Sequence, residues 1–336
     1  MNLDNLKTTG GVDVRGKRVL VRADLNVPVK DGKVTDATRL ERLVPGLRDL
    51  ASRGAKVIVI SHFGRPKGGP APEFSLKPVA ETLAGLIGAP TLFAADCIGQ
   101  AAADVVAKLQ AGQIAVLENL RFHKGEEKND PAFAAELAKL GDIFVGDAFS
   151  TAHRAHASTE AITHLLPSYV GPLMMEEINA LQAALEKPER PTVAIVGGAK
   201  VSTKIPVLEN LVAKVDKLIV GGGMANTFFL AQGVQIGKSL AEPDFAETAL
   251  RIMHAAKQRS CEVVLPHDVV VAEKFEAGAA STVRPALETP ADQMILDVGP
   301  RTVAHYIDVI ARCRTLLWNG PLGAFEIAPF GEGTFV

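Results

Sequence analysis

The stretch that decides the fold is RVLVRADLNVP, residues 18–28. Its first residues, Arg18-Val19-Leu20-Val21, form an apolar run that predicts a buried strand. Arg22, Asp24 and Asn26 then bring a cation, a carboxylate and a carboxamide close together, before Pro28 ends the pattern. Because side chains alternate along a strand, these three polar groups are expected on one face. Ligands of open α/β sheets bind just past the carboxyl ends of strands, so the stretch predicts a ligand site.

Strand-like and helix-like segments alternate along both halves of the chain. In the first half the predicted strands cover 18–23, 55–61, 113–119 and 142–148, and the predicted helices cover about 38–53, 75–88, 99–111 and 131–140. In the second half the predicted strands cover 192–197, 216–221, 262–266, 293–298 and 314–319. This alternation predicts an α/β protein with two parallel sheets, each covered by helices on both faces.

Residues 171–187 (GPLMMEEINALQAALEK) interrupt the alternation. Apolar residues recur in it at helical spacing and prolines lie on both sides, which predicts a helix that connects two domains. The predicted domains are therefore 1–170 and 188–336, with 171–187 as the hinge helix between them. The alternative is an ordinary surface helix of the first domain.

The composition limits the class of protein. A chain of 336 residues with 47% hydrophobic residues suits two domains. The formal net charge of −2 argues against a nucleic-acid-binding protein. The three cysteines form no CxxC pair, so neither a zinc site nor a disulfide framework is predicted, and a reducing cytoplasm fits. The N-terminal MNLDNLKTTG is too polar for a signal peptide, and no apolar run predicts a membrane span.

The first half carries cationic side chains at successive strand ends. They are His62 and Arg65 after the second predicted strand, Arg121 after the third, Arg154 after the fourth, and Arg39 at the start of a helix. Parallel strands bring such ends to one edge, where several guanidinium groups need an anion to oppose their repulsion. A small acid with both a phosphate and a carboxylate would satisfy the set. For any one of these residues, a solvated surface position is the alternative.

The second half carries three glycine turns after strands, at 197–198, 221–223 and 320–323. Glycines allow close approach of the backbone to phosphate, and the helix predicted after the first turn places Lys200 and Lys204 on one face. Neither a P-loop nor a GxGxxG fingerprint occurs, and GVQIGKS at 233–239 misses the Walker A spacing by one residue. The three turns together predict a nucleotide site, although each alone could be a plain strand-to-helix turn. An acid in one half and a nucleotide in the other indicate phosphoryl transfer, with closure of two lobes excluding water.

The quoted segments also match a known family. VRADLNVP, SHFGRP, ENLRF, DAFSTAHRAHAS, VGGAKVSTK, GGGMANTF and WNGPLG occur in this order, and the chain resembles the phosphoglycerate kinase family over essentially its whole length. The resemblance implies two Rossmann-like three-layer αβα domains with parallel sheets, joined by a hinge helix, in a cytoplasmic monomer. It also implies reversible phosphoryl transfer between 1,3-bisphosphoglycerate and ADP, giving 3-phosphoglycerate and ATP, in glycolysis and gluconeogenesis.

The resemblance implies roles for individual residues. The phosphoglycerate would be held by Asp24, Leu25, Asn26, Arg39, His62, Phe63, Gly64, Arg65, Arg121 and Arg154. The nucleotide would be held by Gly197, Gly198, Lys200, Lys204, Gly222, Gly223, Asn319, Pro321 and Glu326, the last at the ribose. The catalytic set would be Arg39, Lys200 and Lys204, with Arg39 and Lys204 neutralising the moving phosphoryl oxygens during direct in-line transfer.

The sequence departs from the family pattern in three places. Gly146 and Ser150 stand where the family usually has Asn and Gly, and little effect is expected. The family pattern also continues past Val336 with a turn whose Asp binds Mg²⁺, so Mg²⁺ is expected with ATP or ADP but no metal ligand is assigned in this chain. Two alternatives stay open: a truncated, non-catalytic phosphoglycerate-binding relative, and a two-domain dinucleotide dehydrogenase suggested by fold alone.

Overall fold

A computed structural model describes residues 5–66 and 69–336. The first four residues of the stretch MNLDNLKTTG therefore lie outside the described residues. The chain divides into two compact units, Met1–Ala180 and Leu181–Val336, here called the N-terminal unit and the C-terminal unit. The boundary falls inside helix α5 (Pro172–Leu185), which occupies the range of the predicted connecting helix. Its role as a hinge between domains 1–170 and 188–336 stays a prediction.

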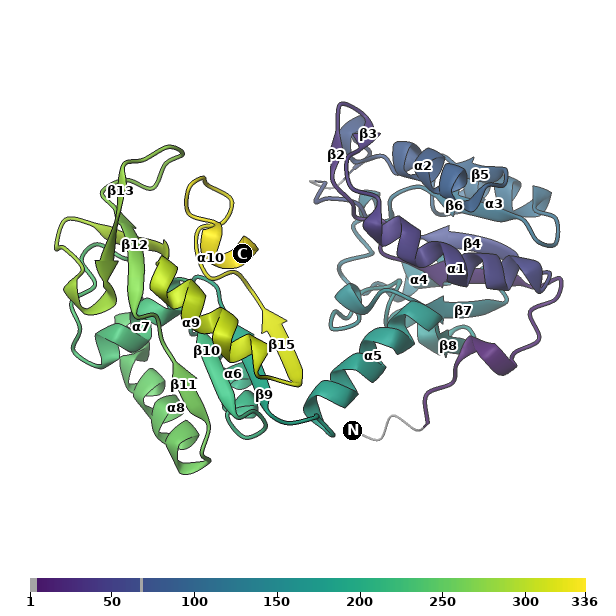
Figure 1. The fold of residues 1–336 in the computed structure, drawn as a ribbon. Coiled ribbons are helices and arrows are strands. Elements are labelled where there is room, and N and C mark those ends of the chain that lie inside the picture. Colours follow the sequence, from purple (N-terminus) through teal and green to yellow (C-terminus); the bar gives the residue numbers. More distant parts are fainter. Residues whose placement is uncertain (1–4, 67–68) are drawn as a thin grey trace. The chain divides into compact units, whose positions relative to one another are not determined.

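The N-terminal unit is built on a six-stranded parallel sheet with the order β5-β6-β4-β1-β7-β8 (Figure 1). Its strands are β1 (Arg18–Arg22), β4 (Lys56–Ile60), β5 (Thr91–Ala94), β6 (Ile114–Leu117), β7 (Ile143–Gly146) and β8 (Ser168–Val170). The short strands β2 (Val29–Lys30) and β3 (Lys33–Val34) form a separate hairpin. The four predicted strands of this half are confirmed, and β5 and β8 are additional.

Helices cover both faces of this sheet, as predicted. They are α1 (Thr38–Ser52), α2 (Lys77–Ile87), α3 (Gly99–Lys108) and α4 (Pro131–Ala138). Alternation along β1 separates two cores: Val19 and Val21 pack with α1 and α2, whereas Leu20 packs with α3 and α4. The predicted start of α4 is confirmed, because the Asp130 side chain accepts a hydrogen bond from the Ala132 N–H at 2.8 Å.

The C-terminal unit contains a four-stranded parallel sheet with the order β11-β10-β9-β15. Its strands are β9 (Thr192–Val196), β10 (Lys217–Val220), β11 (Glu262–Val264) and β15 (Thr315–Asn319), and its helices are α6 (Ile205–Leu211), α7 (Gly223–Ala231), α8 (Ala246–Gln258), α9 (Pro300–Ala311) and α10 (Glu332–Phe335). Val193 and Ile195 of β9 pack with α9, and Ala194 and Val196 pack with α6, α7 and α8. These parallel sheets covered by helices confirm the predicted α/β class.

One strand prediction is wrong in its pairing. Residues 293–298 form a strand, β14 (Met294–Val298), but it belongs to a second sheet and not to the parallel one. This sheet has the order β13-β12-β14, with β12 (Asp268–Ala272) antiparallel to both β13 (Ser281–Pro285) and β14. An apolar run predicts a buried strand, but neither its partner nor its direction.

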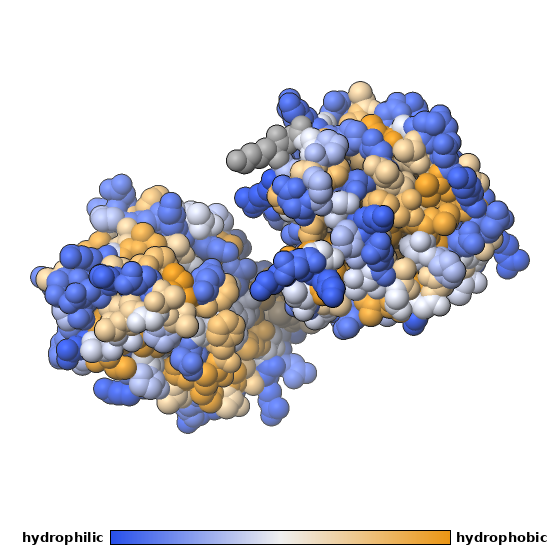
Figure 2. All heavy atoms as spheres, turned by 90° about the horizontal axis from the view of Figure 1, so that it is seen from above, coloured by the Kyte–Doolittle hydropathy of each residue, from blue (hydrophilic) through white to orange (hydrophobic). Residues whose placement is uncertain are grey.

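The two units differ in their exposed surface. Among the described residues, the large hydrophobic side chains that are exposed in the N-terminal unit are Phe149 and Leu165, whereas the C-terminal unit exposes twelve, from Val207 to Val336. Figure 2 shows hydrophobic residues spread among hydrophilic ones on the visible face of the C-terminal unit. No helix in the described part of the chain is long and apolar enough to cross a membrane.

Candidate functional site

The carboxyl ends of the parallel strands meet at one edge of the N-terminal sheet. Arg22 ends β1, His62 and Arg65 follow β4, and Arg121 lies in a short 3-10 helix (Leu120–Phe122) after β6. We call the polar residues of this region the acid edge, after the small acid predicted to bind there. They are Asp24, Asn26, Arg39, His62, Arg65, Arg121 and Arg154. Leu25 and Phe63 are buried in the hydrophobic core beside it.

Burial alternates beyond Arg22 as predicted, with Leu25 and Val27 buried and Asp24 and Asn26 less so, but Asp24 and Asn26 are not on a strand. Strand β1 ends at Arg22, and the chain then turns, because the Asn26 N–H donates to Asp24 Oδ1 at 3.0 Å. The Leu25 N–H donates to Ser61 Oγ at 2.9 Å, which draws the backbone toward the end of β4. Asp24 and Asn26 therefore lie on a loop past the strand, where they are less buried than Arg22.

Asp24 and Asn26 connect three parts of the acid edge. The Arg39 Nη1 donates to Asp24 Oδ2 at 2.7 Å, and the Ser150 hydroxyl donates to the same oxygen at 2.7 Å. The Gly64 N–H donates to Asn26 Oδ1 at 2.9 Å. Ser150, expected to have little effect, is thus bonded to the carboxylate that holds Arg39.

A buried amide that the sequence analysis did not single out aligns the loops after β4 and β6. Asn119 Oδ1 accepts hydrogen bonds from the N–H groups of Phe63 and Arg121 at 3.1 and 3.0 Å. Its Nδ2 donates to the carbonyls of Phe63 and Phe74 at 2.7 and 2.9 Å. Its place in the motif ENLRF was the available signal, since a polar residue directly after an apolar strand often fixes the following turn.

The acid edge holds more positive than negative charge. Arg121 Nη1 donates to the Gly64 carbonyl at 2.7 Å, and its Nε lies 3.2 Å from Glu127 Oε1. Burial lowers the pKa of Arg121 most; the nearby Glu127 opposes this, and Arg154 and Arg65 lower the pKa further. Mutual repulsion of the guanidinium groups is therefore only partly compensated, and an anion placed here would relieve it.

A hollow of about 370 Å³ adjoins part of the acid edge. Its lining includes Asp24, Arg39, Arg42, Phe149 and Ser150. Of the residues predicted to hold the acid, Asp24 and Arg39 line this hollow, and the others lie outside it. The structure thus separates a recessed part of the acid edge around Arg39 from the part formed by the ends of β4 and β6.

In the C-terminal unit the three glycine turns pack against one another, backbone to backbone. A Cβ on Gly197 would collide with the Pro321 carbonyl oxygen, and a Cβ on Gly320 would collide with the Gly197 carbonyl oxygen. The Gly222 N–H donates to the Leu322 carbonyl at 2.9 Å, which joins the second turn to the third. Glycine is therefore required here first for contact between the turns.

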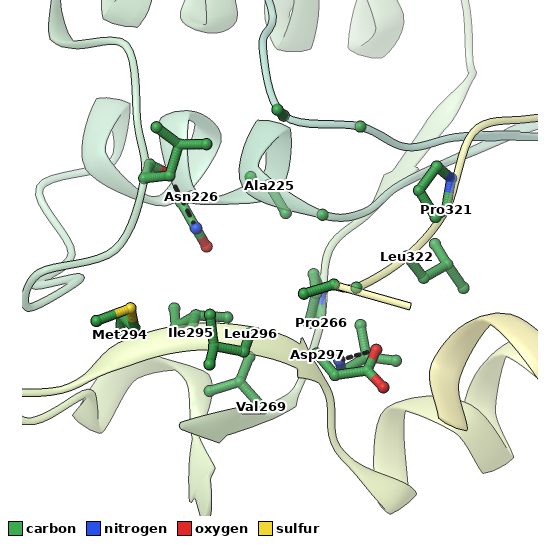
Figure 3. A pocket seen from close by; sticks show the side chains of 18 of the residues that line it. Ala225, Asn226, Pro266, Val269, Met294, Ile295, Leu296, Asp297, Pro321 and Leu322 are labelled. Atoms are coloured by element: carbon green, nitrogen blue, oxygen red, sulfur yellow. Dashed lines mark hydrogen bonds between the residues drawn. The ribbon is translucent and has the colours of Figure 1, made fainter. Parts of the chain in front are cut away.

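These turns form one side of a cavity of about 490 Å³ inside the C-terminal unit, here called the C-terminal cavity. Figure 3 shows Ala225 and Asn226 of α7 on one wall and Met294, Ile295, Leu296 and Asp297 of β14 on the opposite wall, with Pro321 and Leu322 at one side. Most lining side chains are apolar, as in sites that bind a flat organic group.

The predicted nucleotide residues lie in two places. Gly198, Gly222, Gly223, Pro321 and Glu326 line the cavity, whereas Gly197, Lys200, Lys204 and Asn319 do not. The Lys204 ammonium donates to Asn319 Oδ1, so these last two side chains are held together.

The prediction that a helix carries both lysines is wrong. Helix α6 begins at Ile205, so Lys200 and Lys204 lie on the turn before it. Glu242 explains this turn, because it accepts the Ser202 N–H at 2.9 Å and the Ser202 hydroxyl at 2.6 Å. A contact from forty residues away thus overrides the local helical pattern.

Sequence reasoning missed three polar residues that line the cavity: Asn226, Lys238 and Asp297. Lys238 belongs to the segment GVQIGKS, which does not have the Walker A spacing but still contributes this lysine to the cavity lining. Burial raises the pKa of the Asp297 carboxyl to about 6, against the two backbone N–H groups, of Gly333 and Val298, that donate to it.

One group of possible metal ligands lies elsewhere in the described residues. Asp96, Cys97 and His123 offer ligand atoms within 4.8 Å of one another in the N-terminal unit. The His123 Nε2 lies 2.7 Å from Asp96 Oδ1, and burial raises the pKa of the Cys97 thiol well above its ordinary value. A hydrogen-bonded ring and a protonated thiol do not make a preformed metal site.

The family model described as "PGK: Phosphoglycerate kinase" matches residues 10–336. The chain belongs to the phosphoglycerate kinase family. It is 60% identical over 331 residues to the phosphoglycerate kinase of Bradyrhizobium diazoefficiens, covering 98% of this chain and 83% of the relative. It is 59% identical to the phosphoglycerate kinase of Sinorhizobium fredii, covering 96% of this chain and 81% of the relative.

Solved structures of the same family share the fold. The Coxiella burnetii phosphoglycerate kinase matches with a TM-score of 0.80 at 43% identity, covering 98% of this chain and 83% of that one. The Pyrococcus horikoshii enzyme matches with a TM-score of 0.85 at 30% identity, covering 98% and 84%. The predicted family, fold class and kinase activity are confirmed, and the dehydrogenase alternative and the non-catalytic relative are not favoured.

Proposed function

We propose that the acid edge binds 3-phosphoglycerate or 1,3-bisphosphoglycerate, and that the C-terminal cavity and its glycine turns bind ADP or ATP. The enzyme then transfers a phosphoryl group reversibly between these substrates, as the glycolytic member of its family. The observation that supports the acid site is the partly uncompensated charge around Arg121, Arg65 and Arg154. Guanidinium groups match both phosphate and carboxylate oxygens, and a phosphoglycerate carries both groups.

The lining of the C-terminal cavity supports the nucleotide. Apolar walls from α7 and β14 suit a purine base. Lys238 offers a positive charge at the lining, and Glu326 and Asp297 offer carboxyl groups. Lys200 and Lys204 lie on the turn after β9, where they would meet the nucleotide phosphates. Lysine binds phosphate as a point charge, so it needs no fixed planar geometry.

Cations that are already held in place would supply the catalysis. Arg39 is fixed by the Asp24 carboxylate and Lys204 by the Asn319 amide. A preorganised charge stabilises the transferring phosphoryl group without first having to reorganise. The carboxyl leaving group of an acyl phosphate departs as a weak base, so no general acid is needed.

Magnesium is proposed to enter with the nucleotide. The carboxylates that line the cavity do not form a site for the ion. Both oxygens of Asp297 already accept hydrogen bonds from backbone N–H groups, and Glu326 is the one other carboxylate among the described lining residues. We therefore assign no described residue as a magnesium ligand. Mg²⁺ is commonly bound mainly by substrate phosphates and water, which fits this arrangement.

Two further features of the protein are proposed from the family alone. We propose that it is a monomer in the cytoplasm, and that neither nucleic acid nor a membrane is a partner. Sedimentation of the purified chain at several concentrations tests the monomer, because a dimer would give a concentration-dependent mass.

Calorimetry and a coupled assay test the proposed function. The wild-type chain should bind 3-phosphoglycerate alone and MgATP alone, and should consume ATP when 3-phosphoglycerate is added. Lys204→Ala should lower the turnover much more than the affinity for 3-phosphoglycerate, whereas Lys257→Ala, an exposed lysine at the end of α8, should change neither. Loss of 3-phosphoglycerate binding in Lys204→Ala would show that Lys204 is assigned to the wrong substrate.

A further inference from the structure

A fully buried carboxylate lies behind the acid edge. Glu126 is 0% exposed, and both of its oxygens are used by one residue. The Ser158 hydroxyl donates to Oε1 at 2.6 Å and the Ser158 N–H donates to Oε2 at 3.0 Å. His156 Nδ1 lies 3.9 Å from the same Oε1. A buried carboxylate is costly unless it is fully hydrogen-bonded, and Ser158 supplies these bonds.

Ser158 connects this carboxylate to a buried arginine. The Arg22 Nε donates to Ser158 Oγ at 2.9 Å, so the hydroxyl accepts from Arg22 while it donates to Glu126. Arg22 is 2% exposed, and no carboxylate of the described residues lies within 4.0 Å of its guanidinium. The charge of Glu126 therefore acts on Arg22 through one bridging hydroxyl. This hydroxyl fixes the plane of the guanidinium together with the Ala23 carbonyl, which accepts a hydrogen bond from Arg22 Nη1.

Arg22 in turn determines where His62 carries its proton. The Arg22 Nη2 lies 3.1 Å from His62 Nδ1. A guanidinium has donors and no acceptor, so Nδ1 must present a lone pair and the ring proton must be on Nε2. Among the described residues, Nε2 has no hydrogen-bond partner, so it is the donor that remains for a ligand at the acid edge.

The charges around His62 keep the ring neutral. Burial lowers its pKa most, and Arg22, Arg121 and Arg154 lower it further, while Asp24 opposes them; the resulting pKa is about 3. The imidazole is thus neutral near pH 7, and it contributes a hydrogen bond and no additional positive charge.

We infer that Glu126 and Ser158 are positioning residues that act through Arg22 to hold His62 as its neutral Nε2–H tautomer. His62 then donates its Nε2–H to an oxygen of the bound phosphoglycerate. Arg22, Ser158 and Glu126 touch no substrate, and the substrate contact is made by His62. The inference rests on the proposed function only for the identity of the acid, because the tautomer itself is a property of the free protein.

Nitrogen-15 NMR of histidine-labelled full-length protein tests the tautomer without any substitution in the bridge. The resonances of His62 are assigned by their loss in His62→Gln. Between pH 5 and pH 8, wild-type Nδ1 should give the signal of an unprotonated nitrogen and Nε2 that of a protonated one, without titration. A protonated Nδ1, or a ring that titrates with an ordinary histidine pKa, would overturn the inference.

Ser158→Ala and Glu126→Gln test the positioning. Ser158→Ala should raise the KM for 3-phosphoglycerate about tenfold, the scale of one lost hydrogen bond, with kcat changed much less. In the same variant, the nitrogen signals of His62 should move toward a mixture of neutral tautomers, because Arg22 is held less firmly against Nδ1 while burial still lowers the pKa of the ring. Glu126→Gln, which keeps the size of the side chain but removes one acceptor, should move both readouts in the same direction by a smaller factor.

The matched control is Thr302→Ala in the C-terminal unit. The Thr302 hydroxyl donates to the buried Asp268 carboxylate at 2.7 Å, so its loss removes a comparable buried bond away from the acid edge. Thr302→Ala should lower the stability of the chain without changing the KM for 3-phosphoglycerate. If Ser158→Ala and Glu126→Gln matched this control in KM and left the tautomer unchanged, their role would be structural only, and the inference would be overturned.

The experiments distinguish failure of the proposed function from failure of the positioning inference. If the wild-type chain did not bind 3-phosphoglycerate in calorimetry, the assignment of the acid would be wrong even with the expected tautomer. If the wild type bound the acid and His62 were found protonated on Nδ1, the positioning inference alone would be wrong.

Discussion

The acid edge and the C-terminal cavity differ in the groups that a ligand would meet. At the acid edge a ligand meets guanidinium groups held in place by carboxylates and amides, such as Arg39 on Asp24. In the C-terminal cavity it meets mainly hydrocarbon, with turns so closely packed that a Cβ on Gly197 has no room. In the proposed function the first site recognises charge and the second recognises shape, and the lysines proposed to bind phosphate, Lys200 and Lys204, lie outside the cavity lining. The two sites should therefore respond differently to mutation, salt and pH.

The largest difference is expected from adding a single methyl group in each unit. Gly197→Ala places a Cβ against the Pro321 carbonyl and should destabilise the C-terminal unit by about 3–5 kcal/mol, with loss of nucleotide affinity. Gly85→Ala in α2 meets no atom within 4 Å and should stabilise the N-terminal unit by about 0.5–1 kcal/mol. Urea unfolding of each variant measures both. Equal stability of Gly197→Ala and wild type would show that the turns are not in contact.

Removal of one held cation from the acid edge should have the next largest effect. Arg39→Ala should lower kcat by roughly 10²–10³, because one preorganised charge is lost from the transition state. Steady-state kinetics measure this, with the exposed Arg15→Ala as the control of equal charge in the same unit. Near-normal turnover of Arg39→Ala would remove Arg39 from the catalytic set.

Raising the salt concentration should weaken ligand binding at the two sites to different extents, with a smaller effect than that of Arg39→Ala. Raising NaCl from about 0.05 M to about 0.5 M should weaken 3-phosphoglycerate binding about tenfold, because screening acts on exposed charges such as Arg39 and Arg65. Binding of adenosine, an uncharged probe for the C-terminal cavity, should change less than about twofold. Calorimetry of each ligand at both salt concentrations measures the ratio, and equal salt dependence would contradict the comparison.

The smallest expected effect is a pH dependence of the C-terminal unit. The pKa of Asp297 is about 6 in the folded chain and 3.8 ordinarily, so the folded state binds more protons between these values. The free energy of unfolding should therefore fall as the pH rises from about 4 to about 6, by about 1 kcal/mol after allowance for solvent screening. Trp318 in β15, the single tryptophan, reports this unfolding by its fluorescence.

Asp297→Asn is the control for that pH dependence. Its stability should vary less across the same interval, because the titrating group is gone. Identical slopes for the variant and the wild type would assign the pH dependence to another group.

Much of the fold followed from hydrophobic runs. The predicted strands were confirmed because parallel strands buried on both faces need continuous apolar residues. Strands β5 and β8 escaped prediction because they are short and carry polar residues, as in Ser168-Tyr169-Val170. The pairing of β14 was wrong because an apolar run does not encode its partner.

The candidate sites followed from the sequence where the chemistry lies inside a motif. The glycine turns and the arginines at strand ends are such cases. Three polar lining residues were not predicted: Lys238, Asn226 and Asp297. They are brought to the cavity by contacts between residues far apart in the sequence, for example the hydrogen bond from the Lys238 N–H to the Gln293 carbonyl at 2.8 Å. Arg22 was noticed as a cation after a strand, but its burial and its bond to Ser158 could not be read from neighbouring residues.

The place of β1 and β9 within their sheets has a consequence for synthesis on the ribosome. Each is the first strand of its parallel sheet in the chain, yet each lies inside the sheet, between two partners. Val19 of β1 pairs with Val57 early, but its second neighbour, Ile143, is translated much later; Thr192 of β9 likewise waits for Thr315. Each nascent sheet must therefore hold an open slot beside its first strand, where a chaperone or a wrong strand could bind, until the last partner emerges.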